Sequence, residues 1–174
     1  MREAVDRARI EQVMQALGAA ADVPVRVYLT GGATAVLMGW RASTVDIDFV
    51  AVPDGGAMMR AIPALKESLA VNVEIASPAH FVPVPAGWEE RSPFIARHGE
   101  AEFFHFELVA QALAKLERRH ARDRSDIDAM VARGLIDAPA VRACFARMEP
   151  DLYRFPAIDP PTFRRAVDAV FPPG

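Results

Sequence analysis

The chain has 174 residues, of which 52% are hydrophobic and 25% are charged, so it can bury a core and is not disordered throughout. Its formal net charge of −3 excludes a whole-molecule positive field for nucleic acid, and its single cysteine, Cys144, excludes an internal disulfide framework. No apolar run reaches the roughly 18 residues of a membrane span, so we expect a soluble, cytoplasmic protein with no membrane partner.

The sequence predicts alternating helices and strands in the first forty residues of the chain. Apolar residues at helical spacing predict a helix over residues 5–17, which Gly18 ends. Alternating apolar residues predict a strand over residues 25–29 that runs directly into Gly31-Gly32. A short helix is expected over residues 33–38, with Gly39 placed to terminate it.

Two further strands and a hairpin follow. The second strand is predicted over residues 45–52, with Val45 on the core face. A helix over residues 58–69 must kink or restart at Pro63, and a third strand covers residues 71–75. After a Pro-rich extended loop, two short apolar segments flank residues 98–100, which is typical of a hairpin.

The remainder of the chain is predicted to be helical. Helices are expected over residues 108–120, 124–133, 138–148 and 161–170, with a Pro-rich joint at 155–161. The predicted fold class is α+β, with a mixed α/β core over residues 1–107. A helical C-terminal region over residues 108–174 is expected to pack on that core.

An Asp-x-Asp pair lies in the second predicted strand. Because side chains alternate between the two faces of a strand, Asp46 and Asp48 project together from the face opposite Ile47. Two neighbouring carboxylates repel each other unless a cation lies between them, and all-oxygen ligands suit Mg²⁺ or Mn²⁺. Glu74 has the matching parity on the next strand and is the candidate third metal ligand, although an ordinary polar-face residue has the same pattern.

The Gly31-Gly32 pair lies at a strand-to-helix turn. Backbone without side chains can approach a ligand closely there, and a phosphate is a natural occupant. A Gly-Gly pair alone also marks an ordinary turn. Combined with a carboxylate pair at the same edge of the sheet, it favours phosphoryl or nucleotidyl transfer from a nucleoside triphosphate (NTP).

The order strand, Gly31-Gly32, short helix and Arg41-x-x-Thr44-x-Asp46-Ile47-Asp48 resembles the polymerase-β-like nucleotidyltransferase superfamily. It is similar especially to the small prokaryotic branch that includes nucleotidyltransferase toxins of abortive-infection and toxin–antitoxin systems. Three later segments resemble that branch in kind and order: Phe81-Val82-Pro83-Val84-Pro85, Gly87-Trp88-Glu89-Glu90-Arg91, and Leu113-Ala114-Lys115-Leu116 through Arg122-Asp123-Arg124-Ser125-Asp126-Ile127. The resemblance touches about residues 25–130.

The resemblance implies a minimal nucleotidyltransferase fold in which Gly31 and Gly32 contact the nucleotide phosphates and Asp46 and Asp48 bind the metal. It also implies that Lys115 and the Asp123/Asp126 element complete the cleft.

One departure from the superfamily pattern concerns the phosphate turn. The superfamily often has Gly-Ser there, so Gly32 leaves a hydroxyl contact missing unless Thr30 or Thr34 supplies it. The third carboxylate also stays open, with Glu107 as the rival of Glu74, because some members lack it.

A basic segment over residues 115–124 carries five cations and two acids. If one helical phase runs through it, Lys115, Arg122 and Asp126 cluster on one flank, where Lys115 and Arg122 would stabilise triphosphate charge. The alternatives are a solvated helix face for the other arginines and an N-terminal cap for Asp126. Arg41, with Thr44 in the same motif loop, either binds phosphate or pairs with an aspartate of the motif.

The expected activity is metal-dependent transfer of a nucleoside monophosphate from an NTP to a hydroxyl. The acceptor stays open among tRNA or other RNA, a protein and a small molecule, and a toxin-like operon would add an antitoxin partner. One alternative is a catalytically degenerate member that binds a nucleotide or a partner protein. Another is a sugar-nucleotide-dependent glycosyltransferase, in which Asp-x-Asp also binds a metal diphosphate; the small size and the Gly-Gly pair argue against it.

Overall fold

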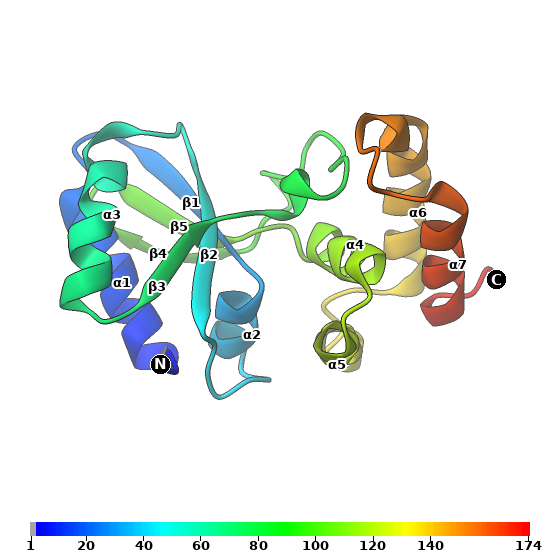
Figure 1. The fold of residues 1–174 in the computed structure, drawn as a ribbon, viewed down its shortest axis with the longest axis horizontal. Coiled ribbons are helices and arrows are strands. Elements are labelled where there is room, and N and C mark those ends of the chain that lie inside the picture. Colours follow the sequence, from blue (N-terminus) through cyan, green and yellow to red (C-terminus); the bar gives the residue numbers. More distant parts are fainter. Residues whose placement is uncertain (1–2) are drawn as a thin grey trace. The chain divides into compact units, whose positions relative to one another are not determined.

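The computed structural model describes residues 3–174, which form two compact units. The first comprises the residues up to Ser77 together with Ser92–Phe106, and the second comprises Pro78–Arg91 together with Glu107–Gly174 (Figure 1). The Pro-rich loop therefore groups with the helical part of the chain, although it precedes the hairpin in sequence. Within residues 3–174, every helix falls short of the length and apolarity that crossing a membrane requires.

The first unit is a five-stranded mixed sheet with three helices. Its elements in chain order are α1 (Arg7–Ala20), β1 (Val25–Thr30), α2 (Gly32–Met38), β2 (Asp46–Val52), α3 (Gly56–Ser68), β3 (Asn72–Ile75), β4 (Phe94–His98) and β5 (Ala101–His105). The strand order is β3-β2-β1-β5-β4. β1 pairs antiparallel with β2 and parallel with β5, β2 pairs parallel with β3, and β4 and β5 form the predicted hairpin. The mixed α/β fold class is confirmed.

One face of this sheet is covered by α1, α2 and α3. Its core consists of apolar side chains from the strands and from the facing sides of these helices: Ile10, Val13, Met14, Leu17, Val27, Leu29, Val36, Ile47, Phe49, Met58, Leu65, Val73 and Phe103. Figure 1 shows α1 and α3 side by side on the sheet, where their residues are in contact. The opposite face carries the alternate residues of each strand, including both aspartates of β2.

Two local expectations for this unit were wrong, and one alternative for a third is excluded. Gly18 lies inside α1, not at its end. A glycine is required there because the helix passes close to the hairpin, where a Cβ would overlap the carbonyl oxygen of His98. Pro63 lies within one continuous α3, which excludes the expected alternative that the helix restarts there. Val45 is 42% exposed and does not lie in the core. It lies between Thr44, which forms a β-bridge to Val5, and Asp46, where β2 begins.

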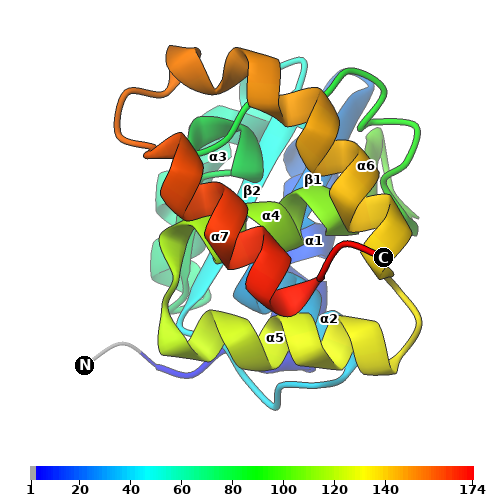
Figure 2. The same cartoon turned by 90° about the vertical axis from the view of Figure 1, so that its right-hand side faces the viewer.

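The second unit is helical. It contains the short 3₁₀ helices η1 (Pro78–His80) and η2 (Glu149–Arg154) and the α-helices α4 (Leu108–Arg118), α5 (Ala121–Ala132), α6 (Ala138–Met148) and α7 (Pro160–Val170). α4 contacts each of the other three α-helices, and Figure 2 shows it in the middle of this group. α6 and α7 meet through the Phe145 and Phe163 rings, whose centroids are 5.0 Å apart, and through an Arg142–Asp168 ion pair of 2.7 Å.

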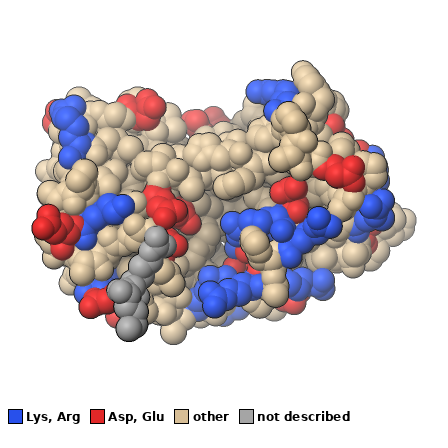
Figure 3. All heavy atoms as spheres, viewed as in Figure 1, with Lys and Arg blue, Asp and Glu red and all other residues tan. Residues whose placement is uncertain are grey.

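The basic segment does not form a single helix. Arg119 adopts a left-handed conformation (φ 58°), which ends α4, and α5 begins at Ala121. The helical phase that would have placed Lys115 and Arg122 on one flank is therefore broken. On the face drawn in Figure 3, basic side chains are interspersed with acidic ones.

Candidate functional site

The carboxylates of β2 lie where strand alternation predicts them. Ile47 and Phe49 are completely buried in the core, whereas Asp46 and Asp48 are partly exposed on the opposite face. The neighbouring strands extend this polar surface: Asp48 is in register with Thr30 on β1 and with Glu74 on β3. The sheet topology therefore brings Asp46, Asp48 and Glu74 to one end of one face.

Asn72 is the residue of this cluster that the sequence reasoning missed. It is in register with Asp46, and its Nδ2 donates to Asp46 Oδ1 (2.6 Å) and to Glu74 Oε1 (2.8 Å). One amide group thus holds two carboxylates that would otherwise repel each other. Its parity, shared with Glu74, was visible in the sequence, but its position beside Asp46 follows only from the pairing of β2 with β3.

The carboxylate oxygens of this cluster suit a hard divalent cation as ligands. Asp46 and Asp48 are the two residues whose chemistry and shared strand face fit such a cation. Glu74 is engaged by Asn72, so binding as a third ligand would require its side chain to turn away from that amide. Within residues 3–174, no group of three or more His, Cys, Asp or Glu side chains is gathered closely enough to hold a metal. The structure thus places two of the three predicted ligands, Asp46 and Asp48, on one face of β2. The third, Glu74, lies on the adjacent strand and accepts a hydrogen bond from Asn72.

Gly31 brings backbone next to the carboxylates. It precedes α2 with φ 61°, a conformation that favours glycine, and a Cβ added there would lie 3.4 Å from Asp48 Oδ2. The strand-to-helix turn and the Asp48 carboxylate are therefore immediate neighbours. A ligand that contacts the backbone of Gly31 would also meet this carboxylate.

Gly32 lies against Thr44. A Cβ at residue 32 would overlap Thr44 Oγ1 and lie 2.7 Å from Thr44 Cβ, so the threonine fills the place of a side chain at this turn. Thr44 is held there by its hydroxyl, which donates to the Asp46 carbonyl (3.0 Å), and by backbone hydrogen bonds with Val5 of 2.7 and 2.9 Å. The hydroxyl group next to Gly32 is therefore that of Thr44, whereas Thr34 is buried and donates to the Leu29 carbonyl (3.4 Å).

This contact predicts that Gly32→Ala lowers the free energy of unfolding by about 1–3 kcal/mol, because the added methyl group overpacks the turn against Thr44. In a Thr44→Gly background the same substitution should cost less than about 0.5 kcal/mol, since both clashing atoms are gone. Urea unfolding of the four proteins measures the coupling. Equal costs in the two backgrounds would contradict the contact.

Arg41 belongs to the turn that closes α2. Its backbone N–H, like those of Gly39 and Trp40, donates to the Ala35 carbonyl, at 3.2 Å for Arg41. Gly39 adopts the left-handed conformation (φ 95°) predicted for the end of this helix. Arg41 therefore lies at the start of the loop that joins α2 to β2, and Thr44 lies near the end of the same loop.

The remaining candidates belong to the second unit. Lys115 is buried, and its Nζ donates to Asp123 Oδ1 (3.0 Å) and Asp126 Oδ2 (2.8 Å), both of which are also buried. Asp126 lies inside α5 and does not cap it, and Arg122 is exposed on the same helix. Glu107 forms an ion pair with Arg91 of 2.5 Å, so the rival third carboxylate has a partner in its own unit.

The Lys115 cluster is electrostatically compensated. Burial opposes the negative charge of Asp123, but hydrogen bonds from Arg118 and the charge of Lys115 outweigh burial, so the pKa of Asp123 lies below its usual value. Arg118 donates to both oxygens of Asp123, at 2.9 and 3.0 Å. These contacts join the end of α4 to the start of α5.

His105 is a buried histidine of the first unit. Its Nδ1 lies 3.1 Å from Thr34 Oγ1, and burial, with a smaller contribution from the positive charge of Arg7, lowers its pKa from 6.5 to about 4. It lines a hollow of about 340 Å³ between α1, α2 and the hairpin, together with His98 and Arg7. The imidazole is therefore neutral at pH 7.

Because the unfolded chain binds this proton more readily, stability should be complete above about pH 6.5 and fall as the pH drops towards 4. We expect His105→Gln to reduce the loss of unfolding free energy between pH 7 and 4.5 by about 2–3 kcal/mol, measured by urea unfolding. The exposed His120→Gln variant is the control and should keep the wild-type pH dependence. Identical profiles for wild type and His105→Gln would contradict a buried neutral imidazole.

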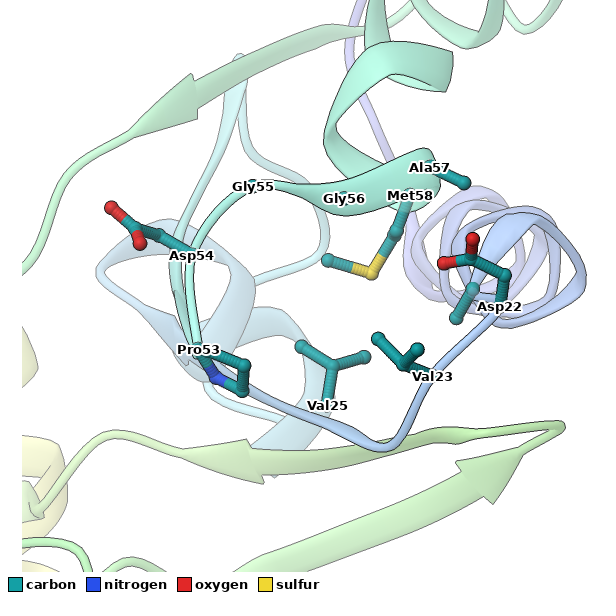
Figure 4. A pocket seen from close by; sticks show the side chains of 10 residues that line it. Asp22, Val23, Val25, Pro53, Asp54, Gly55, Gly56, Ala57 and Met58 are labelled. Carbon is teal, nitrogen blue, oxygen red and sulfur yellow. The ribbon is translucent and has the colours of Figure 1, made fainter.

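A second, smaller pocket lies at the other end of the strands from Asp46 and Asp48. It has a volume of about 40 Å³ and is formed around the start of β1 and the turn after β2, with the side chains of Asp22 and Asp54 at its rim (Figure 4). Nucleotide-sized ligands need several hundred Å³, so this pocket is not a nucleotide site.

A mixed sheet with helices on one face and a carboxylate pair beside a glycine turn is the arrangement of a minimal nucleotidyltransferase fold. The family model described as "Nucleotidyltransferase of unknown function (DUF6036)" matches residues 8–155. The chain belongs to this family, which confirms the predicted nucleotidyltransferase class. No curated protein and no solved structure matches the sequence.

Proposed function

We propose that the chain transfers a nucleoside monophosphate from an NTP to a hydroxyl acceptor. The observation that carries the proposal is the Asp46–Asp48 pair, with Asp48 directly against the Gly31 backbone. In the reaction the acceptor oxygen forms a bond to the α-phosphorus while the bond from that phosphorus to the β-bridging oxygen breaks. Pyrophosphate leaves, and the hydroxyl proton passes to a carboxylate or to water.

Asp46 and Asp48 would hold Mg²⁺ or Mn²⁺, and Glu74 would complete the ligand set after leaving Asn72. The bound cation supplies neutralisation of triphosphate charge and activation of the incoming hydroxyl. The backbone at Gly31 and Gly32 would orient the β- and γ-phosphates, and the Thr44 hydroxyl and Arg41 would contact them from the motif loop. The register of β2 with β1 and β3 and the surroundings of Gly31 and Gly32 support this proposal.

Lys115 and Arg122, in the second unit, are proposed to supply positive charge for nucleotide binding, and Asp126 is proposed to act with them. Lys115 donates to two carboxylates, and its ammonium group has a third N–H that could donate to a phosphate oxygen. Arg122 is exposed, and its guanidinium group can donate to phosphate oxygens. The role of Asp126 in this proposal is to position Lys115.

The activity is tested by incubating the protein with each of the four NTPs and Mg²⁺ or Mn²⁺ in the presence of total tRNA, cell protein or small hydroxyl compounds. Pyrophosphate release together with labelled acceptor supports the proposal and identifies the acceptor class. Release of UDP from UDP-sugars without pyrophosphate would contradict it and indicate glycosyl transfer.

A second candidate is a nucleotide-binding protein without transfer activity. It is favoured by the engagement of Glu74 with Asn72 and by the lack of a gathered three-residue metal cluster within residues 3–174. Calorimetry that detects binding of Mg-NTP, combined with no pyrophosphate release for any acceptor class, would favour this candidate over the enzyme.

A toxin–antitoxin function is a finer proposal that rests on the first. It requires growth arrest on expression of the active protein and its relief by the product of an adjacent gene. Growth arrest that persists when Asp46 and Asp48 are both replaced by asparagine would contradict it.

A further inference from the structure

A row of aromatic rings crosses the sheet on the face that carries Asp48. Tyr28 on β1 is in register with Phe104 on β5, and Phe104 is in register with Phe94 on β4. The Tyr28 and Phe104 rings are stacked with centroids 5.3 Å apart, and Phe94 meets Phe104 edge to face at 5.5 Å. Since paired residues on adjacent strands share a face, the three rings form one continuous apolar row.

Strand register also relates this row to the carboxylates. Thr30 is the partner of Asp48, and Tyr28 precedes Thr30 by two residues on the same face. Phe104 is therefore two strands and two residues from Asp48, a backbone separation of roughly 12 Å. The aromatic row and the candidate metal site therefore lie on one face of one sheet, with the buried Tyr28 ring between them.

The outer end of the row is accessible and is bordered by cations. Phe94 is 59% exposed on the edge strand β4, although it is a large apolar side chain. The Arg26 guanidinium lies 5.9 Å from the centroid of the Phe104 ring. Arg97 is exposed and in register with Glu102, which pairs with Arg26 at 3.6 Å, so two cations face one acid beside the rings.

We propose that the surface formed by Phe94, Phe104 and Arg26 binds an unpaired nucleotide of a single-stranded RNA acceptor. This inference rests on the proposed function and names its acceptor class. A nucleobase stacks on an exposed ring, and the adjoining phosphate is attracted by the arginines; the bases of a duplex are already stacked and cannot do this. A footprint of a few nucleotides also agrees with a chain whose net charge is −3.

The test is binding of a fluorescein-labelled eight-nucleotide single-stranded RNA, followed by anisotropy at low salt with EDTA and without NTP. We expect Phe94→Ala to raise the Kd about tenfold through loss of stacking. Arg26→Ala should raise the Kd and reduce the slope of log Kd against log salt concentration by about one. Tyr153→Ala, which removes a ring that is 78% exposed in the other unit, is the matched control and should bind like wild type.

Phe94→Leu keeps an apolar side chain at the sheet edge but removes the ring, so it should also weaken binding while preserving the thermal unfolding curve. Wild-type Kd values for Phe94→Ala and Phe94→Leu would overturn the inference. So would a wild-type dimer that Phe94→Ala converts to a monomer in size-exclusion chromatography with light scattering, because the row would then be a self-association surface. The binding assay contains no NTP, so its failure is distinct from an absence of pyrophosphate release.

Discussion

Replacing Asp46 and Asp48 together by asparagine should lower the rate of pyrophosphate release by about 10³-fold or more. The substitution preserves shape but removes both charged cation ligands, and charge stabilisation by a bound metal is worth several kcal/mol in a transition state. The thermal unfolding temperature should stay the same or rise slightly, because two carboxylates on one strand face no longer repel each other. Both quantities can be measured on the same preparation.

The matched control for this variant is Asp22→Asn/Asp54→Asn. It makes the same change in net charge in the same unit, on two exposed aspartates at the other end of the strands. It should retain wild-type turnover. Full activity in the Asp46/Asp48 variant would show that the catalytic site has been assigned to the wrong residues.

Replacing Lys115 by methionine should lower the free energy of unfolding by about 3–5 kcal/mol. The substitution leaves the buried carboxylates of Asp123 and Asp126 without their shared cation, and an uncompensated buried charge is strongly destabilising. Arg118 remains paired with Asp123 and offsets part of the loss at that residue. Urea unfolding at pH 7 measures the effect.

Arg124→Met is the control for the Lys115 substitution. It breaks the exposed Arg124–Asp128 ion pair of 2.9 Å within α5 and should change the free energy of unfolding by less than about 0.5 kcal/mol. The triple variant Lys115→Met/Asp123→Asn/Asp126→Asn should recover most of the lost stability, because it removes all three buried charges, and Arg118, which loses the charge of Asp123, is exposed to solvent. A Lys115→Met protein as stable as wild type would contradict the buried cluster.

The triple variant also separates the two roles of Lys115. If Lys115 contacts the triphosphate, as proposed, the stable triple variant should still lose turnover. Turnover at the wild-type level per folded molecule would limit Lys115 to joining α4 and α5.

Strand alternation was sufficient to predict the geometry of β2. A period of two places Asp46 and Asp48 opposite Ile47 and Phe49 whatever the rest of the sheet does, and the structure confirms this. The hairpin, the end of α2 at Gly39 and the bounds of α6 were likewise local features that their own residues specify. Each depends on contacts within a few residues.

The features that sequence reasoning missed depend on contacts between distant segments. Asn72 lies beside Asp46 because β3 pairs with β2 in a particular register, and that register is not written in either strand alone. Thr44 fills the space next to Gly32, twelve positions earlier, and Gly18 is a glycine because of His98. The sequence predicts the interruption between these helices at residues 121–123, but α4 already ends at Arg118, because Arg119 takes a left-handed conformation that its residue type does not favour.

The central claim is that Asp46 and Asp48 together bind the divalent cation. Its most direct test is a crystal structure of the protein with Mn²⁺ and a non-hydrolysable NTP analogue, with the anomalous scattering of manganese recorded. The account predicts a manganese peak about 2.1 Å from carboxylate oxygens of both residues, with the triphosphate against Gly31 and Gly32. A peak held by other residues, or a bound nucleotide far from β2, would contradict it.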